Sequence, residues 1–131
     1  MARNNTMGTF EVTVGFPGGE EVLALVDTGA TFTKLPSDLL ARHGVRPLFE
    51  TDVELANGEV VQRSVGYIDV EIQGRRAPVP VAFGKVRERP LLGATALEIL
   101  GFSADARNQR LVPTPALELL MIRRAAAATL S

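Results

Sequence analysis

The sequence predicts a single, mainly β domain with one or two short helices, on the basis of three observations. Its 131 residues, of which 46% are hydrophobic, fit one globular domain with a core of its own. Its 12 glycines and 8 prolines indicate many turns, as in folds built from short strands. Apolar and polar residues alternate along several short segments, which is the pattern of half-buried strands.

The composition argues against several classes of function. The net charge is −1 and the basic residues are scattered, so neither a nucleic acid nor an acidic membrane surface is an expected partner. The chain has no cysteine, which excludes disulfides and thiolate chemistry, and its one histidine and dispersed acids predict no metal site and no cofactor. No window approaches the roughly 18 apolar residues of a membrane span, and residues 1–8 lack the apolar core of a signal peptide. We therefore expect a cytoplasmic protein.

The first two predicted strands form a pair. Residues 10–14 alternate apolar and polar side chains, which predicts a half-buried strand. Residues 16–20 are rich in turn residues, and residues 21–26 return as the second strand.

The second strand leads directly to an aspartate. It ends in the apolar run Leu23 to Val26 and is followed at once by Asp27, Thr28 and Gly29. A carboxylate at the end of a buried strand would be held rigidly, as a catalytic acid must be. The same residues also suit a surface turn that closes an ordinary hairpin, because aspartate and glycine are common in turns.

A short helix is predicted at residues 36–44. Ser37 is the expected N-cap, and Gly44 stands where a left-handed C-terminal cap is expected. His43 lies in the last helical turn, where the helix dipole favours a cation, so we expect a structural role for it.

Residues 51–72 predict a β-hairpin. Asn57 and Gly58 are the strongest turn signal in the chain, because both residues can adopt positive φ. Gly66 interrupts the alternation of the return strand and indicates a bulge or a bend. Tyr67, the one tyrosine, is expected in the core or at its rim.

The last third of the chain contains a second apolar segment that ends in glycine. Leu91, Leu92 and Gly93 form a short predicted strand that enters a helix at residues 94–100, which Gly101 ends. The remaining expectations are a strand at 79–83, a turn at 105–109, a strand that begins at 111–113, and an apolar tail at 114–131 that fits either strand or helix.

The order of these motifs resembles the retropepsin-like aspartic proteases. The matching motifs are Asp27 to Ala30 after a buried strand, an Ala-Asn-Gly hairpin at 56–58, and Leu-Leu-Gly at 91–93 before a short helix. The resemblance covers residues 9–113. It implies a closed, barrel-like acid-protease fold with a flap hairpin, in which each chain is half of a two-fold dimer. Residues 1–8 would be a flexible lead-in, and the tail at 114–131 would contribute to the dimer.

The chemistry of aspartic proteolysis explains the expected dimer. Two carboxylates must share one proton, so that the ionised group takes a proton while the other gives one. The chain has one Asp-Thr-Gly, since Asp38, Asp52, Asp69 and Asp105 lack the following Thr/Ser-Gly. The second acid must therefore come from a second copy of Asp27, on a two-fold axis.

The resemblance also implies roles for the neighbouring residues. Asp27 would be catalytic, and Thr28 and Gly29 would position the pair of acids. The residues that would contact an extended peptide substrate are Ala30 beside the acid and the flap residues Leu55, Ala56, Asn57 and Gly58. Leu91 to Gly93 would pack beneath the Asp27 loop. The family often carries a charged or amide residue soon after Leu-Leu-Gly, whereas this chain has Ala94 and Thr95.

Three interpretations remain open at this point. The first is a homodimeric aspartic endopeptidase that hydrolyses peptide bonds. The second is a peptide-binding or assembly module on the same fold with weak or no turnover. The third is an unrelated small β-barrel in which Asp27 closes a turn.

Overall fold

The computed structural model describes residues 9–114. The predicted lead-in at 1–8 and the predicted tail from residue 115 onward lie outside the described residues. Within residues 9–114, no helix is long and apolar enough to cross a membrane.

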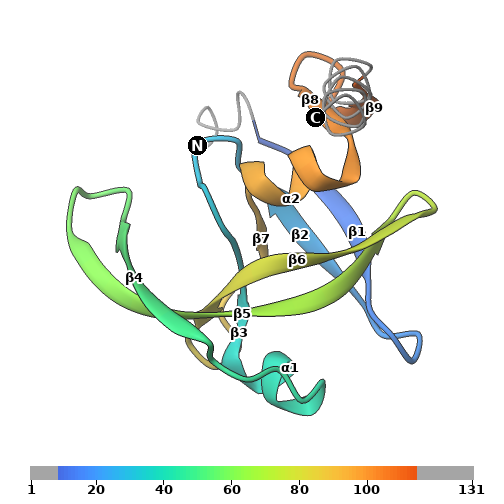
Figure 1. Cartoon of the computed structure of the whole chain (residues 1–131). Helices are drawn as coiled ribbons and strands as arrows, with labels where there is room; N and C mark the ends of the chain where they lie inside the picture. Colours follow the sequence, from blue (N-terminus) through green and yellow to red (C-terminus); the bar gives the residue numbers. More distant parts are fainter. Residues whose placement is uncertain (1–8, 115–131) are drawn as a thin grey trace, which may run out of the picture.

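Within residues 9–114, seven strands form one sheet, and two more form a small hairpin (Figure 1). The order in the large sheet is β1-β2-β7-β3-β6-β5-β4. The bounds of its strands are β1 Glu11–Gly15, β2 Glu21–Val26, β3 Thr33–Pro36, β4 Phe49–Glu54, β5 Val60–Ile72, β6 Arg75–Gly84 and β7 Leu91–Leu92. The small hairpin consists of β8 Phe102–Asp105 and β9 Arg110–Pro113.

The large sheet curls until its strands almost close into a ring. Gly15 in β1 pairs with Glu71 near the end of β5, so the path from β1 through β7, β3 and β6 returns to its start. Strand β4 stays outside this ring and pairs with the first half of β5 alone. The prediction of a mainly β, barrel-like fold is confirmed.

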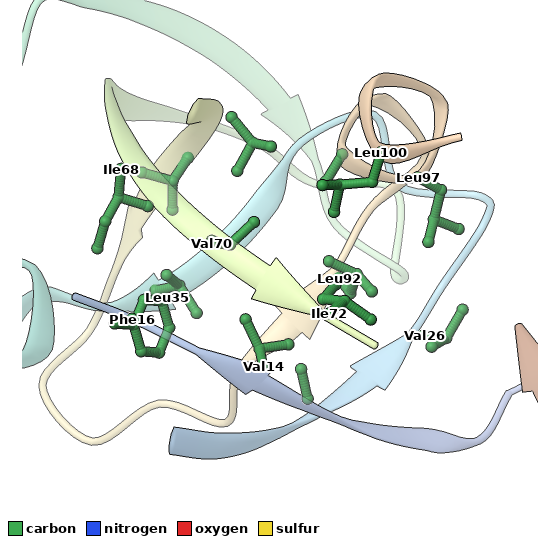
Figure 2. Close-up of a cluster of buried hydrophobic side chains, with 14 of the residues drawn as sticks. Val14, Phe16, Val26, Leu35, Ile68, Val70, Ile72, Leu92, Leu97 and Leu100 are labelled. Atoms are coloured by element: carbon green, nitrogen blue, oxygen red, sulfur yellow. The ribbon is translucent and has the colours of Figure 1, made fainter. Parts of the chain in front are cut away.

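The core fills the interior of the ring and extends beneath α2 (Ala94–Leu100). Figure 2 shows side chains from opposite strands meeting there, with Leu97 and Leu100 descending from α2. Val26 and Leu92 are completely buried. Because they are the last residues of β2 and β7, the segments that follow them begin from rigid anchors.

The two helices in the described part of the chain differ in how well local signals predicted them. Helix α2 begins and ends as predicted, and Gly101 ends it with a φ of 79°. Helix α1 spans Ser37–Arg42, and its N-cap is Pro36, so the prediction of Ser37 as the cap was wrong. Pro36 belongs to β3, and the paired strand continues up to the first helical residue.

His43 has the structural surroundings expected of it. It is the C-cap residue of α1, its Nε2 lies 2.8 Å from Glu20 Oε1, and its ring packs against Phe16 at 5.4 Å between centroids. These contacts join α1 to the turn between β1 and β2. Gly44 follows with a φ of 69°, as predicted for the residue after the helix.

Three local predictions need correction. Strands β3 and β8 were not predicted, although both pair fully with their neighbours. Gly66 forms no bulge: its pairing with Val81 continues the ladder, and a Cβ there would lie 2.5 Å from the carbonyl oxygen of Arg46. Glycine is needed at this position because another segment of backbone passes close to it.

The flap hairpin also turns differently from the prediction. Gly58 has a positive φ of 88°, as expected, but the φ of Asn57 is not positive. The N–H of Gly58 donates to the carbonyl of Leu55, and the N–H of Leu55 donates to the carbonyl of Glu59. The connection is therefore a type I turn followed by a left-handed glycine, which the right-handed strand twist also accepts.

Candidate active site

Asp27 is mounted on the end of a buried strand. The preceding residue, Val26, pairs in parallel with Leu92 of β7. The backbone N–H of Asp27 then donates to the carbonyl of Leu92 at 2.9 Å. The Asp27 backbone is thus held by the sheet, while its side chain lies at the partly exposed edge where the strand ends.

The loop after Asp27 turns back on the carboxylate. The N–H of Gly29 donates to Asp27 Oδ1 at 3.0 Å, and the N–H of Ala30 donates to the Asp27 carbonyl at 3.1 Å. A Cβ on Gly29 would lie 3.3 Å from Oδ1, so glycine allows this close approach. The carboxylate is oriented by its own loop, and Thr28 is exposed at the loop's apex.

A second glycine holds the loop from the other side. The N–H of Gly93 donates to Thr33 Oγ1 at 3.1 Å, and Thr33 is 2% exposed. A Cβ on Gly93 would lie 2.5 Å from the Phe32 carbonyl oxygen and 2.9 Å from that of Ala30. The end of β7 therefore packs directly against the backbone of the Asp27 loop.

The first residues of α2 hold the loop after Asp27 through their backbone groups. The N–H of Ala94 donates to the carbonyl of Ala30 at 2.7 Å, and the N–H of Thr95 donates to the carbonyl of Thr31 at 3.0 Å. These backbone bonds do not depend on the side chains of Ala94 and Thr95, and the contact across the dimer that their identity bears on stays a prediction.

The β4–β5 hairpin projects beyond the ring of strands (Figure 1). Its tip is stabilised by the two backbone hydrogen bonds of the turn and by a third bond, from the N–H of Glu59 to Asn57 Oδ1 at 2.9 Å. The hairpin and the Asp27 loop border the same cleft, whose volume is about 650 Å³.

The cleft brings together most of the predicted site residues. Asp27, Gly29, Ala30, Leu55 and Ala56 all line it. Three other predicted residues, Thr28, Asn57 and Gly58, are exposed and lie outside its lining. Their proposed roles require a partner chain or movement of the hairpin, and they stay predictions.

Sequence reasoning missed several residues that line the cleft. Lys34 and Arg63 bring two cations to its wall, and Leu91, which was expected beneath the loop, is partly exposed to the cleft. A lysine between buried Thr33 and Leu35 was the available signal, because alternation places it on the opposite face of the strand. No local signal identifies Arg63.

A larger hollow of about 780 Å³ lies elsewhere, along β1 and the turn after it. It is lined by glutamates, arginines and turn residues, and Asp27 is not among its lining residues. The strand-end carboxylate makes the smaller cleft the candidate active site.

Comparison with solved structures shows the same fold in viral enzymes. The protease of simian foamy virus (mac) superimposes with a TM-score of 0.52 at 24% identity, over 67% of this chain and 91% of that one. The foamy viral protease–reverse transcriptase, solved with an RNA/DNA hybrid, gives a TM-score of 0.55 at 19% identity. That match covers 67% of this chain but 11% of the much longer viral chain. No curated protein sequence matches the chain.

The fold therefore defines the class: it is the retropepsin-like acid-protease fold. The family model for aspartyl proteases matches residues 10–103. Since this match spans most of the chain, the chain belongs to the aspartyl protease family.

Proposed function

We propose that the protein is a homodimeric aspartic endopeptidase whose two Asp27 carboxylates together activate one water molecule. The observation that carries this proposal is the mounting of Asp27. Its backbone is fixed by Leu92, its Oδ1 is held by the Gly29 N–H, and its side chain borders a cleft. An aspartate that only closed a surface turn would not need both the hydrogen bond to Leu92 and the one from Gly29.

The need for a partner follows from the chemistry and from the exposed loop apex. One chain supplies one such acid, and Thr28 beside it is exposed at the apex of the loop. A two-fold axis through this apex would bring two copies of Asp27 together, with each Thr28 facing the partner loop. The pair would then share a proton, because two like charges at about 3 Å cannot both be ionised.

The reaction proceeds through a bound water molecule. The ionised carboxylate takes a proton from the water as its oxygen forms a bond to the peptide carbonyl carbon. The protonated carboxyl gives its proton to the carbonyl oxygen, which yields a tetrahedral diol. The C–N bond then breaks as the carboxyl that took the proton from water gives it to the nitrogen, while one diol hydroxyl returns a proton to the other carboxylate, so a carboxylic acid and an amine are released.

The substrate would be an extended peptide. The β4–β5 hairpin borders the cleft with Leu55 and Ala56, and an extended chain beneath it could form main-chain hydrogen bonds while alternate side chains enter pockets. Movement of the hairpin would allow Asn57 and Gly58 to approach the substrate.

The test compares the full chain with Asp27→Asn, using Asp69→Asn as a matched control because Asp69 is exposed on β5 and does not line the cleft. A random peptide pool serves as substrate, mass spectrometry identifies cuts, and sedimentation gives the oligomeric state. We expect Asp27→Asn to remain a folded dimer and to lose about a thousandfold or more in cleavage rate, while Asp69→Asn cuts like the wild type.

Two results would contradict the proposal. Undiminished cleavage by Asp27→Asn would remove Asp27 from the mechanism. Saturable peptide binding without products, in a wild-type dimer that an aspartic protease transition-state analogue leaves unaffected, would instead identify a peptide-binding module.

A further inference from the structure

The wall of the cleft carries an unusual row of side chains. Lys34 in β3 pairs with Ala82 of β6 on one side and with Leu91 of β7 on the other, and all three line the cleft. A lysine thus stands in the middle of an otherwise small and apolar row.

A second cation lies on the same face of the sheet. Ala82 pairs with Val65 of β5, and Arg63 is two residues before Val65, so both point to the same side. Arg63 also lines the cleft, opposite Thr51 of the hairpin strand β4. Lys34 and Arg63 therefore lie where the β4–β5 hairpin extends from the ring of strands.

Glu88 pairs with the first of these cations, Lys34, and the charge of Arg63 also acts on it. Lys34 Nζ lies 2.6 Å from Glu88 Oε2, and both side chains are about three-quarters buried. Glu88 Oε1 accepts a hydrogen bond from the N–H of Lys85 at 2.7 Å. Burial raises the pKa of Glu88, but the hydrogen bonds from Lys34 and Lys85 and the charge of Arg63 together hold it below 4.5, so Glu88 is ionised at neutral pH.

Arg63 retains unused binding capacity. Its Nε is buried, yet it makes no hydrogen bond within residues 9–114. A buried donor without an acceptor costs free energy, and a guanidinium is shaped to bind a carboxylate with two parallel hydrogen bonds. Asp52 and Glu54 also border the cleft, but both are exposed to solvent, which screens their charges.

From this cluster we propose that the cleft has a subsite for an acidic substrate side chain, formed by Arg63 with Lys34. The inference rests on the proposed proteolytic function and assigns it a substrate class: peptides with aspartate or glutamate close to the scissile bond. The substrate carboxylate would accept hydrogen bonds from Arg63 and would add a second negative charge to that of Glu88. In a two-fold dimer the subsite occurs twice, so the preference extends to both sides of the bond that is cut.

The test uses two substitutions that should act in opposite directions. Arg63→Gln removes the donor pair, and we expect the enrichment of acidic residues around cut sites in a random peptide pool to fall about tenfold or more. Glu88→Gln removes the internal competitor and keeps an oxygen for the Lys85 N–H, so the enrichment should rise. The matched control is Arg76→Gln, since Arg76 is exposed, pairs with Glu71 and lies outside the cleft lining.

A purely structural ion cluster would give a different result. Both variants would then lower stability and overall rate, without opposite changes in acid preference. Thermal unfolding is measured for each variant. If Arg63→Gln does not fold, Glu88→Gln and the charge-conserving Arg63→Lys provide the same comparison.

A binding experiment distinguishes a failure of this inference from a failure of the proposed function. Randomly displayed peptides are selected on the folded Asp27→Asn chain with Arg63 intact or replaced by glutamine. Arg63-dependent selection of acidic peptides by a wild-type protein that cuts nothing would retain the subsite and reject the protease. Cleavage with no acid preference, or with one independent of Arg63, would overturn the subsite and retain the protease. Neither cleavage nor acidic selection would overturn both.

Discussion

Gly93→Ala tests whether the close packing of β7 against the Asp27 loop positions the carboxylate. Gly93 has a φ of −97° and a ψ of 177°, an extended conformation that alanine adopts without strain. The added methyl group, however, would lie 2.5 Å from the Phe32 carbonyl oxygen and 2.6 Å from its carbon. The substitution therefore acts through lack of space alone.

The size of the effect follows from these distances. Ordinary van der Waals contact begins at 3.4 Å, so the Phe32 carbonyl or β7 has to move by about 0.9 Å. Both groups are backbone and cannot rotate away. Overpacking of this kind costs about 1–3 kcal/mol of unfolding free energy. A displacement of about 1 Å near reacting groups lowers a catalytic rate by about a hundredfold.

Urea unfolding and peptide cleavage measured on the same preparation check both expectations. The matched control is Gly15→Ala, since its Cβ would meet its nearest neighbour, the Glu71 carbonyl oxygen, at 3.7 Å. We expect Gly15→Ala to cleave at the wild-type rate and Gly93→Ala to lose kcat more than it raises KM. Equal stability and equal kcat in Gly93→Ala and wild type would refute the reasoning, as would equal losses in the two variants.

Three further substitutions test contacts around this framework. Thr33→Val keeps the shape of the side chain but leaves the buried Gly93 N–H without its acceptor, so unfolding should become easier by about 1–3 kcal/mol, while Thr33→Ser retains most of the stability in the same urea titration. Arg75→Met removes two hydrogen bonds to the carbonyls at the C-terminal end of α2, of 2.9 and 2.8 Å, and we expect a loss of about 1–3 kcal/mol by calorimetry; an unchanged melting temperature would show that α2 does not depend on this arginine. The hydrogen bonds of Glu20 with His43 and with Arg42 hold its pKa below 4.5. The contribution of these bonds to the stability is therefore complete above that pH and is lost as the pH falls through the lowered pKa. Glu20→Gln should therefore be less stable than wild type by about 0.5 kcal/mol at pH 6, given its partial exposure, and the difference should shrink towards pH 3; a difference independent of pH would contradict this assignment.

The sequence contains enough local information to predict the mounting of Asp27. The apolar run before it ends where β2 ends, and Gly101 ends α2 as its position in the sequence predicts. These signals are the alternation of apolar and polar residues, chain-breaking residues, and glycines that adopt positive φ. All of them can be recognised from neighbouring residues alone.

Long-range packing explains what the sequence did not predict. Strand β3 is four residues long and forms because β6 and β7 lie on either side of it, and the alternation at Thr33 to Leu35 is too short to predict it alone. The local sequence around Gly66 indicates a bulge. Glycine is needed there instead because the carbonyl oxygen of Arg46, distant in the sequence, lies too close for a Cβ. Arg63 and Lys34 likewise come to line one cleft only after β5, β6 and β3 have paired.

Mixing wild-type protein with the Asp27→Asn variant tests most directly whether two copies of Asp27 form one catalytic centre. The wild-type concentration is held constant and increasing amounts of the variant are added under conditions in which chains exchange. Heterodimers contain a single acid, so cleavage should fall to about half at an equimolar mixture and to about one tenth at a ninefold excess of the variant. Cleavage that stays constant throughout the titration would contradict a shared centre, because each wild-type chain would then be acting alone.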